Sequence, residues 1–192
     1  MALSAACLLF LAAVPAAASA VTGSAGAPAG TSADQAGGFN GPVVTHPAAG
    51  PVTYQPGEVC SFGVHITFPV NQVVQRTWTN DAGQPVFAIA GGLLIARVTN
   101  MATGQTTVAN LNQTGTYSYP GDGSFVLSGS GGILAGFHTG DTPHNELIFS
   151  RVNARSFMSV RVTTGDGHVT RTLLQLNGPH EDLCEVLASA QG

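Results

Sequence analysis

One short segment, FHTGDTPHNELIFSR at residues 137–151, contains the residue types that metal binding and acid–base catalysis use. His138, Asp141 and His144 recur there at every third position, and Glu146 follows them. Imidazole nitrogens and carboxylate oxygens are common ligands of transition metals, and a metal site needs several of them to converge. On a helix, this spacing would place the first three side chains on one face. The segment is therefore the main candidate for a metal or catalytic site.

The local sequence argues against that convergence. Gly140 and Pro143 interrupt the segment, and both of its flanks have the composition of strands. We therefore expect a loop between two strands, in which the candidate ligands need not meet. The sequence predicts no bound metal and no cofactor, and His138, Asp141 and His144 form only a weak candidate cluster. We expect Glu146 to pair with an arginine at the surface.

Other catalytic signatures do not occur in the chain. There is no G-x-S-x-G nucleophile elbow, and the similar SGSGG at residues 128–132 lacks the strand-to-helix context that an elbow requires. Phosphate-loop and dinucleotide-binding fingerprints are absent. No pair of carboxylates stands out among the ten acidic residues. We therefore assign no catalytic residue, and an enzyme is the less favoured class.

The elements that must position these residues are short strands. Apolar residues alternate with Ser61, Gly63, His65 and Thr67 across residues 60–70, which is the period of a half-buried strand. Turn sequences rich in Gly, Asp and Asn separate the later apolar segments. We expect further strands at residues 73–79, 85–90, 93–100, 106–111, 114–119, 124–128, 133–137, 146–152, 157–164 and 168–176. Only residues 181–188 have a helical period, and that segment is too short to define an element.

The N-terminal part of the chain has the composition of a targeting segment and a tether. Residues 1–20 are apolar and end in Ala-Ser-Ala, so we expect a signal peptide and a secreted, extracellular protein. Residues 21–56 are dominated by Gly, Ala, Ser, Thr and Pro, which predicts a flexible tether with a short extended arm at Val43-Val44. We expect the β domain at residues 57–188 and a tail at residues 189–192. With the signal peptide removed, we expect no membrane span.

Two cysteines, Cys60 and Cys184, remain after the expected signal peptide. An even count in an exported protein predicts a disulfide. Cys60 opens the first strand and Cys184 follows the last, so a bridge would bring the two ends of the sheet together. We therefore predict an all-β fold, an antiparallel closed or nearly closed β-barrel of about 8–10 short strands, with a β-sandwich as the alternative.

The charge pattern excludes one class of partner. Only 8% of the residues are charged, there is no lysine, and the formal net charge is −4. Without a basic run, the chain has nothing to hold a phosphate backbone, so we predict no nucleic-acid binding.

Three side chains are candidates for facing a ligand. His65 lies opposite the apolar face of its strand, and Trp78 is the only tryptophan. Arg97 interrupts the apolar strand sequence LLIARVTN. For His65 and Arg97 we favour an ordinary surface position, and for Trp78 a position in the core or at a barrel mouth. Each would gain a binding role only if a barrel lumen were open and polar.

A resemblance supports export and fold. The cysteine and aromatic at the start of the first strand, the segments VTNMATGQTT and YPGDGSFVLSG, and the final cysteine after a glycine turn are similar to small secreted β proteins of high-GC Gram-positive bacteria. The function of those proteins is uncharacterised. Because the shared features are turns and a disulfide, the resemblance implies no site residue.

The sequence therefore favours a secreted, non-enzymatic binding or surface-interaction module. The alternatives are a lipocalin-like carrier of a small ligand and a cyclase- or isomerase-type barrel enzyme with a few polar lumen residues. A filled lumen would favour the interaction module, whereas an open polar lumen would favour the alternatives. The expected partners are a cell-surface component or a second copy of the chain.

Overall fold

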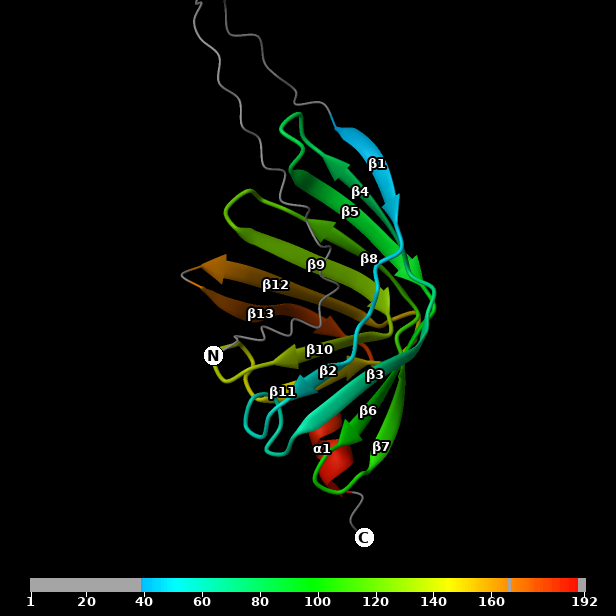
Figure 1. Cartoon of the computed structure of the whole chain (residues 1–192), viewed down its shortest axis with the longest axis vertical. Helices are drawn as coiled ribbons and strands as arrows, with labels where there is room; N and C mark the ends of the chain where they lie inside the picture. Colours follow the sequence, from blue (N-terminus) through cyan, green and yellow to red (C-terminus); the bar gives the residue numbers. More distant parts are fainter. Residues whose placement is uncertain (1–38, 166, 190–192) are drawn as a thin grey trace, which may run out of the picture.

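The computed structural model describes residues 39–165 and 167–189. The expected signal peptide, most of the expected tether and residues 190–192 lie outside the described residues. The described chain forms fourteen strands and one short helix (Figure 1). In chain order they are β1 (Asn40–Thr45), β2 (Val52–Tyr54), β3 (Val64–Asn71), β4 (Val74–Thr79), β5 (Pro85–Gly92), β6 (Leu94–Asn100), β7 (Thr106–Asn110), β8 (Gln113–Ser118), β9 (Ser124–Gly131), β10 (Ile133–Phe137), β11 (Glu146–Ser150), β12 (Phe157–Gly165), β13 (His168–Asn177), β14 (His180–Asp182) and α1 (Leu183–Ser189).

These strands form three antiparallel sheets, so the protein is all-β as the sequence predicts. A seven-stranded sheet has the order β1-β4-β5-β8-β9-β12-β13, a four-stranded sheet the order β2-β3-β6-β7, and a three-stranded sheet the order β10-β11-β14. In Figure 1 the large sheet occupies the upper part of the molecule and the two smaller sheets lie below it. None of the sheets closes on itself in the described chain. The expected barrel is therefore not supported, and the alternative, a sandwich, fits.

Sharp corners explain why the sheets stay open. Four connections of one or two residues carry the chain from one sheet into another: β3 to β4, β5 to β6, β7 to β8, and β9 to β10. Gly92 and Gly132 stand at two of these corners. A side chain at Gly92 would overlap the backbone carbonyl oxygen of Gln72, and one at Gly132 would overlap that of Asn110. Glycine at these two positions therefore lets the backbones of neighbouring strands approach closely where they bend from one sheet into the next, as in orthogonally packed sheets.

We expect Gly132→Ala to destabilise the fold by about 1–3 kcal/mol, because the new methyl group meets fixed backbone and the corner must shift. Gly140→Ala is the matched control, since a methyl group there would meet nothing within 4 Å. Denaturant unfolding of both variants measures the difference. Equal midpoints for the two variants would show that the corner tolerates a side chain.

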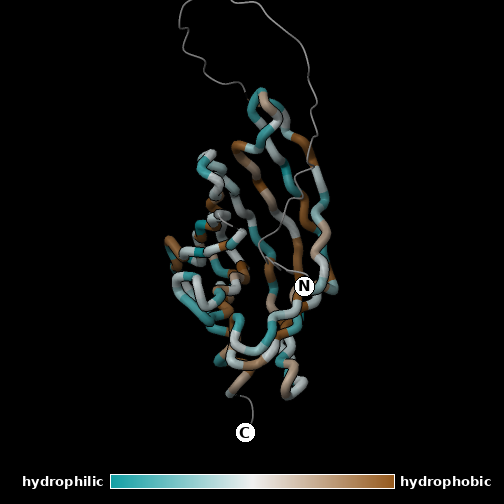
Figure 2. The backbone as a smooth tube through the Cα atoms, turned by 60° about the vertical axis from the view of Figure 1, so that its left-hand side comes forward, coloured by the Kyte–Doolittle hydropathy of each residue, from teal (hydrophilic) through white to brown (hydrophobic). Residues whose placement is uncertain are grey.

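The core joins all three sheets. Ala88, Tyr117, Leu127 and Val160 lie side by side on four adjacent strands of the large sheet, and all four are buried. They belong to one apolar cluster together with buried residues of the two smaller sheets. Figure 2 shows hydrophobic and hydrophilic residues following one another along the strands, as a sheet with one buried face requires. We call this buried side of the large sheet its inner face.

The ordered structure begins earlier than the sequence predicts. The tether was expected to run to residue 56, but β1 pairs with β4 and β2 pairs with β3. Every residue of β1 is exposed, so backbone hydrogen bonds to β4, not burial, hold it in place. Tyr54 at the end of β2 is 1% exposed and belongs to the core. The expected arm at Val43-Val44 lies within β1.

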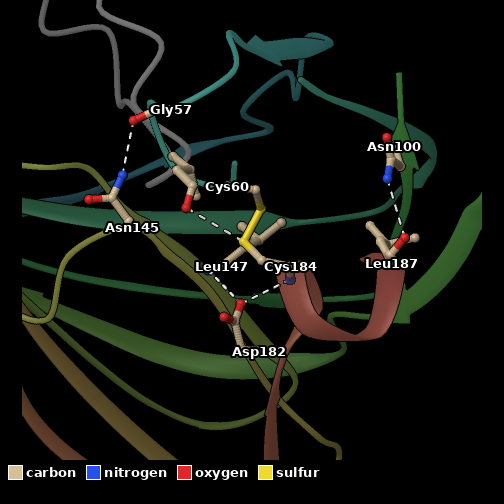
Figure 3. The surroundings of a disulfide bond; sticks show 9 residues. Gly57, Cys60, Asn100, Asn145, Leu147, Asp182, Cys184 and Leu187 are labelled. Atoms are coloured by element: carbon tan, nitrogen blue, oxygen red, sulfur yellow. Dashed lines mark hydrogen bonds between the residues drawn. A yellow bond between two sulfur atoms is a disulfide. The ribbon is translucent and has the colours of Figure 1, made fainter. Parts of the chain in front are cut away.

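The predicted disulfide joins Cys60 to Cys184 (Figure 3). It does not close a barrel; it ties α1 to the turn that precedes β3. The Asp182 carboxylate accepts hydrogen bonds from the backbone N–H groups of Leu147 and Cys184, which fixes the start of the helix. At the other end, the Asn100 side chain donates to the carbonyl oxygen of Leu187. The described residues contain no helix that is long and apolar enough to cross a membrane.

Candidate functional site

Asp141 anchors the loop that joins β10 to β11. Its carboxylate accepts hydrogen bonds from the backbone N–H of His138 at 2.6 Å and from that of Arg171, in β13, at 2.7 Å. It also lies 3.2 Å from the Arg171 guanidinium, and the two side chains are 1% and 7% exposed. The hydrogen bonds and the ion pair of the Asp141 carboxylate therefore hold the loop against the large sheet.

The same loop protects a sheet edge. The Thr142 N–H donates to the carbonyl oxygen of Arg171, and its carbonyl oxygen accepts from the N–H of Leu173. Thr142 thus occupies part of the otherwise open edge of β13, where another chain could pair. The loop that contains the candidate catalytic residues therefore covers part of the β13 edge of the large sheet.

The histidines of the loop do not build a metal site with Asp141. The His138 ring packs edge-on against Tyr54, with 5.3 Å between the centroids, whereas His144 is exposed. Burial lowers the pKa of His138, and the charge of Arg171 lowers it further. Within the described residues, no three His, Cys, Asp or Glu side chains lie where they could share a metal ion.

The three other candidates lie on outward surfaces of two sheets. His65 is in β3, and its Nδ1 atom shares a hydrogen bond of 2.9 Å with the Thr53 hydroxyl. Arg97 is exposed on the neighbouring strand β6, where it pairs with Thr67. Trp78 lies in β4 of the large sheet, away from the other two. Because no sheet closes in the described chain, these side chains do not face a common lumen.

Trp78 belongs to a continuous surface that sequence reasoning missed. We call this surface the outer face; it is the side of the large sheet opposite the core. Trp78 pairs with Phe87 across β4 and β5, with 5.7 Å between their ring centroids, and both rings are partly exposed. Strand register places the following side chains on the outer face: Val74, Arg76, Trp78, Phe87, Ile89, Gly91, Thr114, Thr116, Ser118, Val126, Ser128 and Ser130.

A hollow of about 510 Å³ opens in the outer face at the corner of the sheet. Gly91 and Gly92 contribute no side chains there, which leaves the space. Arg76 and Ile89 line one side of it. The remaining lining residues are Val74, Asn112, Gln113, Thr114 and Ser130. Hydroxyls, amides, aliphatic groups and one guanidinium therefore meet in the hollow.

Gln113, the first residue of β8, carries an unsatisfied side-chain oxygen, and strand alternation places this side chain on the inner face with Gly115 and Tyr117. Its Oε1 atom is buried and has no hydrogen-bond partner among the described residues. A buried amide oxygen without a donor raises the free energy of the folded state. Sequence inspection could not find this group, because it depends on how β8 meets the corner.

A second hollow, of about 430 Å³, lies beside β11 and β14 and has an acidic lining. Glu146, Glu181, Asp182 and Glu185 line it together with apolar residues of β11 and β13. Glu181 forms an ion pair with Arg151 at 2.6 Å. An arginine was expected to pair with Glu146, but Arg151 pairs with Glu181 instead. Burial raises the pKa of Glu146, and the nearby Asp182 and Glu185 carboxylates raise it further.

We expect Glu146→Gln to stabilise the protein slightly at pH 7, by at most about 1 kcal/mol, because Glu146 is only partly buried. Its raised pKa means that the folded state binds a proton more readily than the unfolded state. The carboxylate therefore destabilises the fold above the folded-state pKa, and this penalty disappears as the pH falls below the unfolded-state pKa. Thermal unfolding at pH 7 and pH 4 should show a gain only at pH 7; an equal gain at both values would contradict this explanation.

No protein-family model, curated protein or solved structure matches this chain. The function must therefore be inferred from the geometry of its surfaces.

Proposed function

We propose that the chain is a secreted, non-enzymatic surface-interaction module that binds a cell-surface component through the outer face of its large sheet. The observation that carries this proposal is the hollow of about 510 Å³ beside the partly exposed Trp78–Phe87 pair. Aromatic rings are common anchors of binding surfaces, and a neighbouring depression with polar groups can orient a bound ligand. The groups at this hollow bind and orient ligands but supply no acid or base near neutral pH.

Two further features support an extracellular setting. The Cys60–Cys184 disulfide belongs to oxidising compartments, and the predicted signal peptide would direct the chain there. Arg76 is the one charged residue among the lining residues of the hollow, and a single guanidinium without a basic run is a poor match for a phosphate backbone. The carrier and barrel-enzyme alternatives are less favoured, because both require a lumen and the described sheets stay open.

Adsorption to isolated cell walls of a high-GC Gram-positive bacterium tests the proposal. The purified chain is mixed with washed walls and sedimented, and the bound fraction is measured for the wild type and for Trp78→Ala. We expect the substitution to reduce binding about tenfold or more, because aromatic anchors dominate binding surfaces. Arg97→Ala, on a different sheet, should bind like the wild type. Equal binding by the wild type and Trp78→Ala would reject the outer face as the binding surface.

A further inference from the structure

Two adjacent residues of the loop between β10 and β11 hold it against β13. The Asp141 carboxylate accepts a hydrogen bond from the backbone N–H of Arg171. The Thr142 backbone bonds to the Arg171 carbonyl oxygen and to the Leu173 N–H. These hydrogen bonds occupy backbone groups at the edge of the large sheet, where another strand could otherwise pair. A change that moves residues 138–142 away from β13 therefore uncovers that edge.

His138 begins this loop, and its ring is packed in the uncharged form that the surroundings favour. Its backbone N–H donates to the Asp141 carboxylate at 2.6 Å, and its ring lies edge-on against Tyr54, which is 1% exposed. The Nε2 atom of the ring is buried and has no hydrogen-bond partner among the described residues. A neutral imidazole carries one N–H group, whereas an imidazolium carries an N–H group on both nitrogens. Protonation in the closed loop would therefore bury a charged donor without an acceptor, which costs more than burying the neutral ring.

The titratable groups around His138 come from four segments. Arg171 lies in β13, Asp141 in the loop itself and Glu58 in the turn before β3, and Tyr54 of β2 is in ring-to-ring contact. The two carboxylates favour a protonated imidazole, whereas the guanidinium disfavours it. Burial of the ring, followed by the charge of Arg171, outweighs the carboxylates and lowers the pKa of His138. The charges at this position therefore oppose protonation of the ring as long as the loop is closed.

We propose that residues 138–145 form a pH-sensitive cover of the β13 edge, which is released when His138 takes up a proton. In the open loop the ring is solvated and titrates near pH 6.5, as an ordinary histidine does. Because the closed loop binds the proton less readily, opening is favoured as the pH falls below about 6.5. The backbone groups that Thr142 occupies on β13 then become available to another strand. The cover uses no residue of the outer face, so it stands or falls independently of the proposed function.

Amide hydrogen exchange followed by NMR tests the proposal on the full chain. The probes are the N–H groups of Thr142 and Leu173, which join the loop to β13. After correction for the intrinsic pH dependence of exchange, their protection should fall about five- to thirtyfold from pH 7.5 to pH 5. The upper value is the ratio by which uptake of one proton near pH 6.5 favours the open loop. The Leu111 N–H, which donates to the carbonyl oxygen of Leu94, is the reference for global unfolding and should change little.

Two variants identify the histidine that controls the loop. His138→Phe keeps an aromatic ring next to Tyr54 but takes up no proton, so Thr142 and Leu173 should be equally protected at pH 7.5 and pH 5. His144→Phe is the matched control, because it makes the same substitution at an exposed histidine of the same loop. We expect it to keep the pH dependence of the wild type.

Titration of the His138 ring resonances in the wild type gives a readout that needs no variant. Its midpoint should lie below that of a solvated histidine, because the closed loop opposes protonation. A midpoint at or above the ordinary value would overturn the proposal, and so would equal protection of Thr142 and Leu173 at pH 7.5 and pH 5 in the wild type. If His138→Phe still loses protection at pH 5, another group controls the loop and the proposal is wrong.

Discussion

The Cys60→Ala/Cys184→Ala double variant should unfold at a temperature about 10–20 °C below that of the oxidised wild type. The bridge spans 124 residues of sequence, and the chain-entropy relation gives about 5 kcal/mol for a loop of that size. For a domain of this length, each kcal/mol shifts the unfolding temperature by about 2–4 °C. Alanine is preferred to serine because Cys60 is 1% exposed and a hydroxyl there would be buried.

Reduction provides the control for this result. A thiol reductant should lower the unfolding temperature of the wild type towards that of the double variant and leave the variant itself unchanged. Both forms should still unfold in one cooperative transition, because the core joins all three sheets. An unfolding temperature of the double variant within about 2 °C of the oxidised wild type would show that the bridge contributes little to stability.

Asp141→Ala should destabilise the protein by about 3–5 kcal/mol, the usual effect of removing one partner from a buried ion pair. The substitution takes away the acceptor of two backbone N–H groups and leaves the Arg171 guanidinium buried without its carboxylate. The loop would also lose its hold on β13, next to the Thr142 contact. Denaturant unfolding measures the loss.

Two further variants separate the causes of this effect. Asp122→Ala is the matched control, because its carboxylate accepts comparable hydrogen bonds from Ser124 but is fully exposed. We expect a much smaller loss there. Asp141→Ala/Arg171→Met should be more stable than Asp141→Ala alone, because no buried charge is left behind. Equal losses for Asp141→Ala and Asp122→Ala would show that the buried pair has no special role.

Most strands could be predicted because their signals are local. The expected strand at residues 133–137 is β10, and the expected hairpin of residues 157–164 and 168–176 is the β12–β13 pair. Glycine- and aspartate-rich turns mark these ends, and β-branched residues fill the segments between them. The strand expected from Cys60 begins instead at Val64, because a turn at residues 57–60 and the disulfide hold the cysteine.

The choice between barrel and sandwich could not be made from the sequence. The alternation of buried and exposed residues continues from β5 through Gly92 into β6, so the pattern is the same for a straight strand and for a corner. The disulfide satisfies either arrangement. Similarly, the sequence predicted only a short extended arm at Val43-Val44 where β1 lies, because β1 buries no side chain and its order comes from pairing with β4, far along the chain.

The candidate site was only partly accessible from the sequence. Trp78 was recognised, but its pairing with Phe87 could not be found by counting back from the turn at residues 80–83, because the register shifts between Trp78 and Thr79. The role of Asp141 depends on its contacts with the distant strand β13, which no local pattern reveals. The histidine spacing at residues 138–144 was misleading because the loop follows the edge of β13 and not a helix.

Acrylamide quenching of Trp78 fluorescence in the wall-bound state tests the central claim most directly. Trp78 is the only tryptophan of the chain and lies on the proposed binding surface, where it is partly exposed. If the outer face binds the cell-surface component, the quenching constant should fall severalfold when the chain is bound, because the ligand covers the indole. A quenching constant that is the same for the bound and the free chain would contradict the account.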